Sequence, residues 1–310
     1  MVMARVHLSL TLAALLVLAG CTGGGTAPST TDETTEEATT LEATQTAGTT
    51  DSATEGETAT STNSSTLGAD DEAFEENVSK VLSEMESQWN YTAGGDLDAN
   101  ETIRRHVLAL GDVESVTIRT TSREEGGNRT YYSNSVTKAT ESRELYRTNG
   151  SVLGTMVRYT EGNQSYLKMV RENETHYAEL GTPNVSEETS QNLSTAVIAL
   201  DLLDLWLAPY EEAGTVTRNG TTLTKYEATG PGYYAEGATG NRTVASFSGT
   251  VLIDEDGLVR YFHREIVYER DGVRTTSMTT VQYVDVNATE VERPDWLDEF
   301  EDHGDEGEDE

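Results

Sequence analysis

Cys21 is the only cysteine in the chain, and its surroundings point to a specific modification. It follows Leu18-Ala19-Gly20, at the end of an apolar run that begins at Leu8, and Arg5 makes the start of the chain positive. This arrangement is typical of a lipoprotein signal peptide, and the run is shorter than the roughly 20 residues of a membrane-spanning helix. The sequence predicts cleavage before Cys21 and a lipid on its thiol, with two or more acyl chains for stable attachment. The alternative, an ordinary signal peptide with a chance cysteine, is disfavoured by the four matching positions.

No other residues form a recognisable catalytic or metal-binding pattern. A lone cysteine excludes a disulfide framework and a thiolate metal cluster. The histidines lack the spacing of metal ligands, and His106, beside the apolar face of a predicted helix, is interpreted as a packing or capping residue. Asp254-Glu255-Asp256-Gly257 lacks the spacing and distal glutamate of a calcium loop, so a hairpin turn is the preferred interpretation. With no nucleophile elbow or phosphate loop, the sequence predicts no catalytic residue, no metal, no cofactor and no enzyme activity.

Asparagine side chains offer a second kind of modification. Many Asn-x-Ser/Thr acceptors occur, and several lie in predicted turns where a glycosyltransferase could reach them. A threonine-rich chain also produces such triplets by chance. The predicted N-glycosylation sites are Asn128, Asn149, Asn163, Asn173, Asn219 and Asn241.

Charge argues against nucleic acid as a partner. The formal net charge is -34, from 55 Asp and Glu residues against 21 Lys and Arg residues. Such a surface repels nucleic acid, so no nucleic-acid partner is expected. The acidic excess persists over residues 71–293 after both ends of the chain are set aside. This lysine-poor, acid-rich composition resembles that of proteins from salt-loving archaea, in which high salt screens the repulsion. The alternative is an ordinary acidic secreted protein.

Composition divides the chain into four parts. Residues 1–20 are the predicted signal peptide, and residues 21–69 are a Thr- and Glu-rich segment that cannot form a core and is predicted to be a disordered tether. Residues 70–296 are long enough for a single domain, and 297–310 form a predicted frayed, acidic tail.

Periodicity predicts two helices followed by antiparallel strands. An apolar stripe from Phe74 to Trp89 predicts one helix, capped by Asp70 or Asp71, and Glu101–Leu110 predicts a second, capped by Asn100. The pattern then alternates with a period of two in about ten short runs separated by Asn-Gly and Asp-Gly turns. So many antiparallel strands in one domain are expected to curl or close.

The central segment 190–208 is predicted to be a helix that is apolar on nearly all sides, with Asp201 and Asp204 on its one polar side. It is too short to cross a membrane, so the concave side of a curved sheet is its expected place. Two interpretations stay open: the helix fills the core, or it lines a cavity for a lipid or other hydrophobic ligand. The predicted lining residues are Leu200, Leu203, Trp206 and Leu207.

Several stretches resemble an uncharacterised family of haloarchaeal surface lipoproteins. They are Gln88–Gly95, Ile103–Leu110, the hairpin Gly249–Arg260 and the ending Arg293-Pro294-Asp295-Trp296. In architecture the body also resembles the LolA-like lipoprotein carriers, which implies a half-open antiparallel barrel that holds helices and a lipid-sized cavity. Members of the first family commonly carry twin arginines in the signal, whereas this chain has only Arg5, which leaves its export route open.

The expected fold class is therefore α+β, a strongly curved antiparallel sheet (a LolA-like half-open barrel) with helices packed in its concave side. The expected function is non-catalytic: a lipoprotein anchored through Cys21 on the extracellular face of the cell membrane, binding a lipid or other hydrophobic ligand. The alternative is a structural or protein-interaction lipoprotein of the envelope without a ligand cavity. The oligomeric state, the ligand and the partner proteins stay open.

Lowering the salt concentration to tens of millimolar is predicted to destabilise the domain. The acidic excess within residues 71–293 then loses its screening, because the screening length grows from roughly 3 Å at 1 M to roughly 30 Å at 0.01 M. Thermal melting across a salt series measures the effect. An unchanged melting temperature would show that the acidity is not an adaptation to salt.

Overall fold

A computed structural model describes residues 69–89, 95–172, 174–180, 202, 205–206, 208–230 and 243–304. The predicted signal peptide, Cys21, nearly all of the tether, Asn173, Asn241, Leu200, Leu203 and Leu207 lie outside these residues. Within them, no helix has the length and apolar character needed to cross a membrane.

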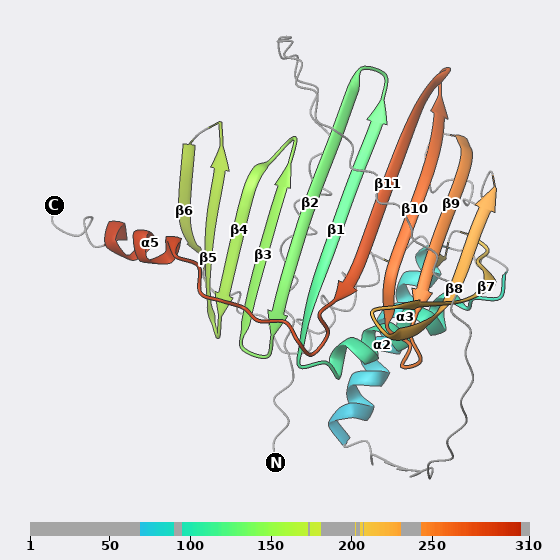
Figure 1. Cartoon of the computed structure of the whole chain (residues 1–310), viewed down its shortest axis with the longest axis horizontal. Coiled ribbons are helices and arrows are strands. Elements are labelled where there is room, and N and C mark those ends of the chain that lie inside the picture. Colours follow the sequence, from blue (N-terminus) through green and yellow to red (C-terminus); the bar gives the residue numbers. More distant parts are fainter. Residues whose placement is uncertain are drawn as a thin grey trace, which may run out of the picture.

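The described body is dominated by one antiparallel sheet of eleven strands (Figure 1). Their order across the sheet is β6-β5-β4-β3-β2-β1-β11-β10-β9-β8-β7, so two meanders meet where β1 pairs with β11. The predicted run of short strands is thereby confirmed. The strands are β1 (Ser115–Gly126), β2 (Arg129–Thr140), β3 (Arg143–Gly150), β4 (Gly154–Glu161), β5 (Gln164–Arg171), β6 (Glu174–Leu180), β7 (Glu211–Arg218), β8 (Thr221–Gly230), β9 (Thr243–Ile253), β10 (Val259–Arg270) and β11 (Val273–Val284).

Two predicted hairpin turns have the expected backbone. Asn219-Gly220 joins β7 to β8 and Asp271-Gly272 joins β10 to β11, and all four residues have positive φ values between 50° and 82°. Two consecutive residues with positive φ match the right-handed twist of the strands they connect, which is why Asn-Gly and Asp-Gly are preferred there. These pairs therefore predicted both the turns and the antiparallel pairing.

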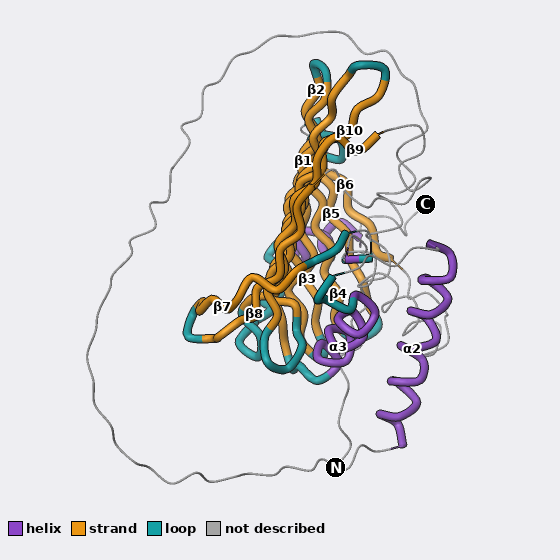
Figure 2. Tube along the Cα trace, turned by 90° about the vertical axis from the view of Figure 1, so that its right-hand side faces the viewer, coloured by secondary structure: helices purple, strands orange, loops and turns teal. Residues whose placement is uncertain are grey.

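The main core lies on one side of the sheet, here called face 1. Val116 and Ile118 of β1 lie there with Val281 and Tyr283 of β11, and all four side chains are buried. The helices α2 (Ala69–Trp89) and α3 (Ala99–Gly111) lie on this side of the sheet (Figure 2). Four residues of α3 point into the core, and α2 adds two: Ile103, His106, Val107, Leu110, Val78 and Leu82.

The caps of these helices differ from the prediction. Asp98, rather than Asn100, caps α3, since its carboxylate accepts a hydrogen bond from the Glu101 N–H at 3.0 Å. Asn100 lies inside the helix, where its side chain accepts a hydrogen bond from the Trp206 indole at 2.6 Å. The prediction for α2 was also wrong, because this helix starts at Ala69 and places Asp70 and Asp71 in its first turn.

The described end of the central apolar segment is a turn packed into the core. Leu202, Leu205, Trp206 and Ala208 are each at most 2% exposed, and the Leu205 N–H donates to the Leu202 carbonyl at 2.9 Å. A bond to the residue three positions earlier forms a tighter turn than an α-helix. For these residues the first interpretation holds, namely that the segment fills the core.

A second, smaller core lies on the opposite side, face 2, under the C-terminal segment. After β11 the chain crosses face 2 in front of the strands to reach α5 (Trp296–Gly304), as Figure 1 shows. Trp296 and Leu297 pack with Val291 on Tyr159 of β4, and Trp296 stacks on Tyr177 with 5.9 Å between ring centroids. The tail is therefore not frayed from residue 297. Trp296, Leu297 and Phe300 give its first turns an apolar face among acidic residues.

The fold class is confirmed as an α+β arrangement with one large, open antiparallel sheet and few helices. No described strand pairs with the outer edge of β6 or β7, so the sheet does not close into a barrel within the described residues. Packing of helices on the core-bearing face was expected, whereas coverage of face 2 by α5 was not. The C-terminal segment packs there because Tyr159, a large aromatic side chain, points to face 2 and is shielded from water by this segment.

His106 joins α3 to the sheet. Its ring is fully buried, its Nδ1 accepts a hydrogen bond from the Val259 N–H at 3.1 Å, and its edge meets the Tyr283 ring at 4.5 Å between centroids. Because Nδ1 accepts, the proton of the neutral ring is on Nε2. Burial lowers the pKa of His106 from 6.5 to about 3. The prediction that His106 is a packing residue is confirmed.

His106 is predicted to make the folded state less stable as the pH falls below about 6.5. The unfolded chain binds a proton near that pH, whereas the folded chain resists until about pH 3, so stability rises with pH between these values. The slope contributed by one such group is at most about 1.4 kcal/mol per pH unit. Urea unfolding between pH 7 and 5.5 measures it, above the range where most carboxylates titrate.

The variant His106→Gln should lose this slope, and His263→Gln, at a half-buried position on face 2, should keep it. Equal slopes in both variants would contradict the assignment to His106.

Candidate functional site

Trp206, the one described member of the predicted ligand lining, is 1% exposed and belongs to the main core. It lines neither of the two pockets described below. Leu200, Leu203 and Leu207 lie outside the described residues. The described part of the central segment therefore provides packing, and the candidate site lies elsewhere, beside α3.

The candidate site is built around the β9–β10 turn, residues 254–258. Asp254 holds this turn: its backbone N–H donates to the Leu258 carbonyl at 3.1 Å, and its carboxylate accepts from the Leu258 N–H at 2.9 Å. The other carboxylate oxygen accepts from Arg260 Nε at 2.6 Å, and the Asp254 side chain is 3% exposed. A buried carboxylate with a cation and a backbone donor fixes both turn and cation in place. The sequence prediction of a hairpin turn here is confirmed.

Arg105 connects α3 to the same turn. Its Nη2 donates to the Glu255 carbonyl at 3.0 Å, and its side chain lies against Gly257. A Cβ on Gly257 would stand 2.6 Å from the Arg105 Nε, and the φ of +91° there also disfavours other residues. Glycine is therefore required at 257 both by the turn and by the arginine.

The larger pocket, here called the α3 pocket, has a volume of about 500 Å³. Its apolar wall comes from α3, the loop that follows it, the β9–β10 turn and the segment after β11: Leu108, Ala109, Val113, Leu258 and Val286. Its polar rim consists of Arg105, Asp112, Asp254, Asp256, Arg260 and Asn287. Four of the apolar residues are only half-buried at the edge of the main core, so part of their surface faces the pocket.

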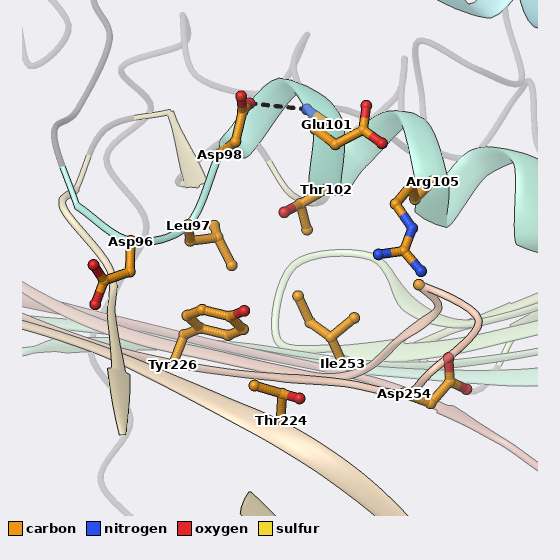
Figure 3. A pocket seen from close by; sticks show the side chains of 11 residues that line it. Asp96, Leu97, Asp98, Glu101, Thr102, Arg105, Thr224, Tyr226, Ile253 and Asp254 are labelled. Carbon is orange, nitrogen blue, oxygen red and sulfur yellow. Dashed lines mark hydrogen bonds between the residues drawn. The ribbon is translucent and has the colours of Figure 1, made fainter. Parts of the chain in front are cut away.

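The smaller pocket lies on the other side of Arg105 and has a volume of about 180 Å³ (Figure 3). Four carboxylates line it together with Arg105: Asp96, Asp98, Glu101 and Asp254. Ligand pockets for drug-sized molecules start near roughly 300 Å³. The small pocket is below that size, whereas the α3 pocket is within the range.

Local electrostatics distinguish the two pockets. A hydrogen bond with Asp96 raises the pKa of the Glu211 carboxyl, and burial raises the pKa of the Tyr226 hydroxyl beside it. The Glu211 shift is that of two neighbouring carboxyl groups. The rim of the α3 pocket instead carries charges of both signs, from two arginines and three aspartates, next to the apolar wall. In the described part of the chain, no three acidic, histidine or cysteine side chains are placed to hold a metal ion.

The predicted glycosylation sites that the structure describes are all at the surface. Asn128, Asn149, Asn163 and Asn219 are exposed, and each lies in a hairpin turn or in the adjoining end of a strand. Their modification stays a prediction.

Sequence reasoning missed Arg105 and the α3 pocket. A signal was present, because Leu108 and Ala109 widen the apolar stripe of α3 beyond the face formed by Ile103, Val107 and Leu110. A stripe wider than one core contact indicates a second contact surface on the same helix.

Comparison with known proteins gives one family match and several distant structural likenesses. The model of a "Family of unknown function (DUF7537)" matches residues 109–300, more than half of the chain. The curated proteins give no match.

Among solved structures, lipoprotein LppX of Mycobacterium tuberculosis is 13% identical with a TM-score of 0.33, over 60% of this chain and 93% of LppX. LprF of Mycobacterium bovis is 11% identical with a TM-score of 0.30, over 64% and 96%. A DUF1329 family protein of Desulfovibrio piger is 10% identical with a TM-score of 0.23, over 64% and 96%. At these scores, the function has to be derived from the residues of this chain.

Loss of the Asp254 carboxylate is predicted to destabilise the fold. Asp254→Ala removes the acceptor of the Leu258 N–H and leaves Arg260 without its partner, which should cost about 3 kcal/mol, at the lower end for breaking a buried ion pair. Asp256→Ala, an exposed change in the same turn, should stay within about 0.5 kcal/mol. Urea unfolding of both variants measures the difference, and equal losses would show that Asp254 does not hold the turn.

Proposed function

The chain belongs to the family of unknown function DUF7537, and we propose that it is a lipid-anchored envelope lipoprotein that binds an amphiphilic ligand without catalysis. The ligand occupies the α3 pocket, with its apolar segment on the wall and its polar head at the rim. The volume of about 500 Å³, combined with that apolar wall, is the observation that carries this proposal.

The wall favours an apolar segment for an energetic reason. Leu108, Ala109, Val113 and Val286 are half-buried at the edge of the core, so a ligand would remove their remaining surface from water. Burial of apolar area contributes roughly 25 cal/mol per Å². The site is also pre-formed, because Arg105 and Asp254 hold the β9–β10 turn that forms one side.

The rim favours a head group that carries both charges. Arg105 and Arg260 offer guanidinium groups, whereas Asp112 and Asp256 offer exposed carboxylates. A purely anionic head would meet the carboxylates, and a purely cationic head would meet the arginines. A zwitterionic head, such as phosphocholine, satisfies both kinds of group.

The proposed anchor and location rest on the residues around Cys21. Cys21 after Leu18-Ala19-Gly20 supports a lipid at the amino terminus, and residues 22–69 can reach roughly 160 Å when fully extended. The body then works on the extracellular face of the cell membrane, within reach of membrane amphiphiles.

A second function is favoured by a different observation. β7 is exposed along nearly its whole length, and no described strand pairs with its outer edge. Such an edge can accept a strand from another protein. In that case the chain is a protein-interaction component of the envelope and the α3 pocket has no ligand. The irregular register between Glu212 and Thr215 weakens this edge as a template, because bulges disrupt strand pairing.

The wild-type chain is predicted to bind decylphosphocholine in a saturable way, below the concentration at which this probe forms micelles. Leu108→Asn, which replaces a wall residue by a polar group of similar size, should weaken binding about tenfold or more, since burial of a leucine side chain is worth about 1.5–3 kcal/mol. Isothermal titration calorimetry measures both affinities, and thermal melting verifies that the variant is folded.

Leu153→Asn is the control, because Leu153 is exposed in the β3–β4 turn and does not line the pocket. It should bind like the wild type. If the wild-type chain does not bind, or if both variants are weakened equally, the α3 pocket is not the ligand site and the interaction function is preferred.

A further inference from the structure

The large apolar side chains exposed on the described surface are gathered at one end of the sheet. This end carries the β1–β2, β3–β4, β5–β6 and β10–β11 turns, and α3 lies toward the other end (Figure 1). Single exposed apolar residues are ordinary on a protein surface, but a cluster of them marks a contact surface. The exposed residues are Tyr131 (40%), Tyr132 (45%), Val152 (61%), Leu153 (48%), Met169 (40%) and Val273 (52%).

Five of these residues, Tyr131, Tyr132, Val152, Leu153 and Met169, belong to four consecutive strands and their turns and are here called the hairpin-end patch. The backbone N–H of Tyr132 donates to Ser151 Oγ at 3.1 Å, and the Ser151 N–H donates to the Tyr132 carbonyl at 3.0 Å. These bonds hold the β3–β4 turn, with Val152 and Leu153 at its tip, against β2. Met169 lies on β5, opposite Met156 of β4. The patch is therefore a set of exposed side chains at one end of the sheet, with Tyr131 and Tyr132 on opposite faces of β2.

Charge at this end differs from the rest of the chain. The four turns, taken as residues 123–132, 150–154, 171–174 and 269–274, carry five arginines and six acidic residues, a difference of one negative charge over 25 residues. The whole chain has a net charge of -34 over 310 residues, which is about one negative charge per nine residues. The ion pairs are exposed and local, such as Arg171 with Glu172 at 3.8 Å and Arg274 with Glu269 at 3.5 Å. Exposed pairs are weak, so these arginines can turn to another anion.

We propose that the hairpin-end patch contacts the surface of a phospholipid bilayer. Val152, Leu153, Tyr131 and Tyr132 meet the interfacial region together, and the neighbouring arginines contact lipid phosphates. Tyrosine rings are favoured at that depth because they are apolar with a polar tip. An anionic membrane also repels this near-neutral, arginine-rich end less than it repels a part of the chain with the average charge.

A bilayer suits the patch better than a soluble partner because of its place in the chain. The body is joined to the proposed lipid on Cys21 by a segment that spans roughly 160 Å when extended, so either end of the sheet can reach the membrane. A tethered contact acts at high effective concentration, so a patch of five partly exposed residues is sufficient. This contact orients the body and does not involve the α3 pocket.

The test places an environment-sensitive dye on one introduced thiol. The chain has a single cysteine, which is blocked if it carries lipid, so the wild-type chain extracted from membranes should take up no maleimide dye. Leu153→Cys puts the dye in the patch. Ser142→Cys, exposed in the β2–β3 turn at the opposite end of the sheet, is the matched control. Both are reconstituted with vesicles of phosphatidylcholine and phosphatidylglycerol (3:1).

The dye at 153 should shift its emission to shorter wavelength and be quenched by spin-labelled lipid, and the dye at 142 should show neither effect. Adding Val152→Asp to the Leu153→Cys chain should abolish the shift. If wild-type chain takes up dye, the lipid anchor of the proposed function has failed, and the same comparison is made on Cys21→Ser at saturating vesicle concentration.

Three results would overturn the proposal: no shift at 153 on vesicle-bound protein, equal shifts at both positions, or a shift at 153 that appears without vesicles and grows with protein concentration. The last result would mean that the patch joins two copies of the chain.

Discussion

The register between β1 and β11 determines which residues of the sheet lie on face 1 and which lie on face 2. This pairing joins the meander β1–β6 to the meander β7–β11, and it sets Ile118 opposite Tyr283 and Thr120 opposite Val281. The apolar residues of both strands thereby meet on face 1, under α3. Because side chains alternate along a strand, a slip of one residue would turn Val116 and Ile118 to face 2, away from the core under α3. Burial under α3 therefore selects the register.

That register also explains why the two halves of the sheet are covered on opposite sides. Because paired residues lie on the same face, the register from β1 through β2 and β3 to β4 places Tyr159 on face 2, where it is fully buried. The C-terminal segment must therefore cross to face 2, and Thr289 fixes the crossing through a 2.8 Å hydrogen bond with Thr117 of β1. On face 1 of the same half, a buried ion pair joins Glu144 to Arg158. Burial raises the pKa of Glu144 against the opposing influence of Arg158.

The sequence predicts the elements of this fold better than their contacts. Alternating residues and the Asn-Gly and Asp-Gly turns predict the strands and their order within each meander, because these signals act between neighbours. The β1–β11 pairing joins residues 149 to 167 positions apart and depends on which surfaces are buried, which no local pattern records. Asn100 shows the same difficulty, since it resembles a cap but bonds Trp206 instead, a contact created only by packing. The apolar spacing of Trp296, Leu297 and Phe300 is too short to predict a packed helix by itself. The helix is stabilised by contacts with Tyr159 and Tyr177, which the sequence does not show.

The position of the α3 pocket follows from how the core is filled. Trp206, Leu202 and Leu205 occupy the space between α3 and the strands, so the described centre of face 1 is packed and an empty volume remains at its edge. The β9–β10 turn packs on α3 at Arg105 through Gly257, and the open volume lies between this contact and the residues that follow the helix. Asp254 stiffens the turn, and Arg105 binds it through the Glu255 carbonyl. His106, the next residue, accepts a hydrogen bond from β10 on the buried side of the helix. Two consecutive residues of α3 thus hold the helix on the β9–β10 hairpin, Arg105 at the surface and His106 in the core. For this reason the candidate ligand site lies at the end of α3 rather than beside the apolar segment, where the sequence alone predicted it.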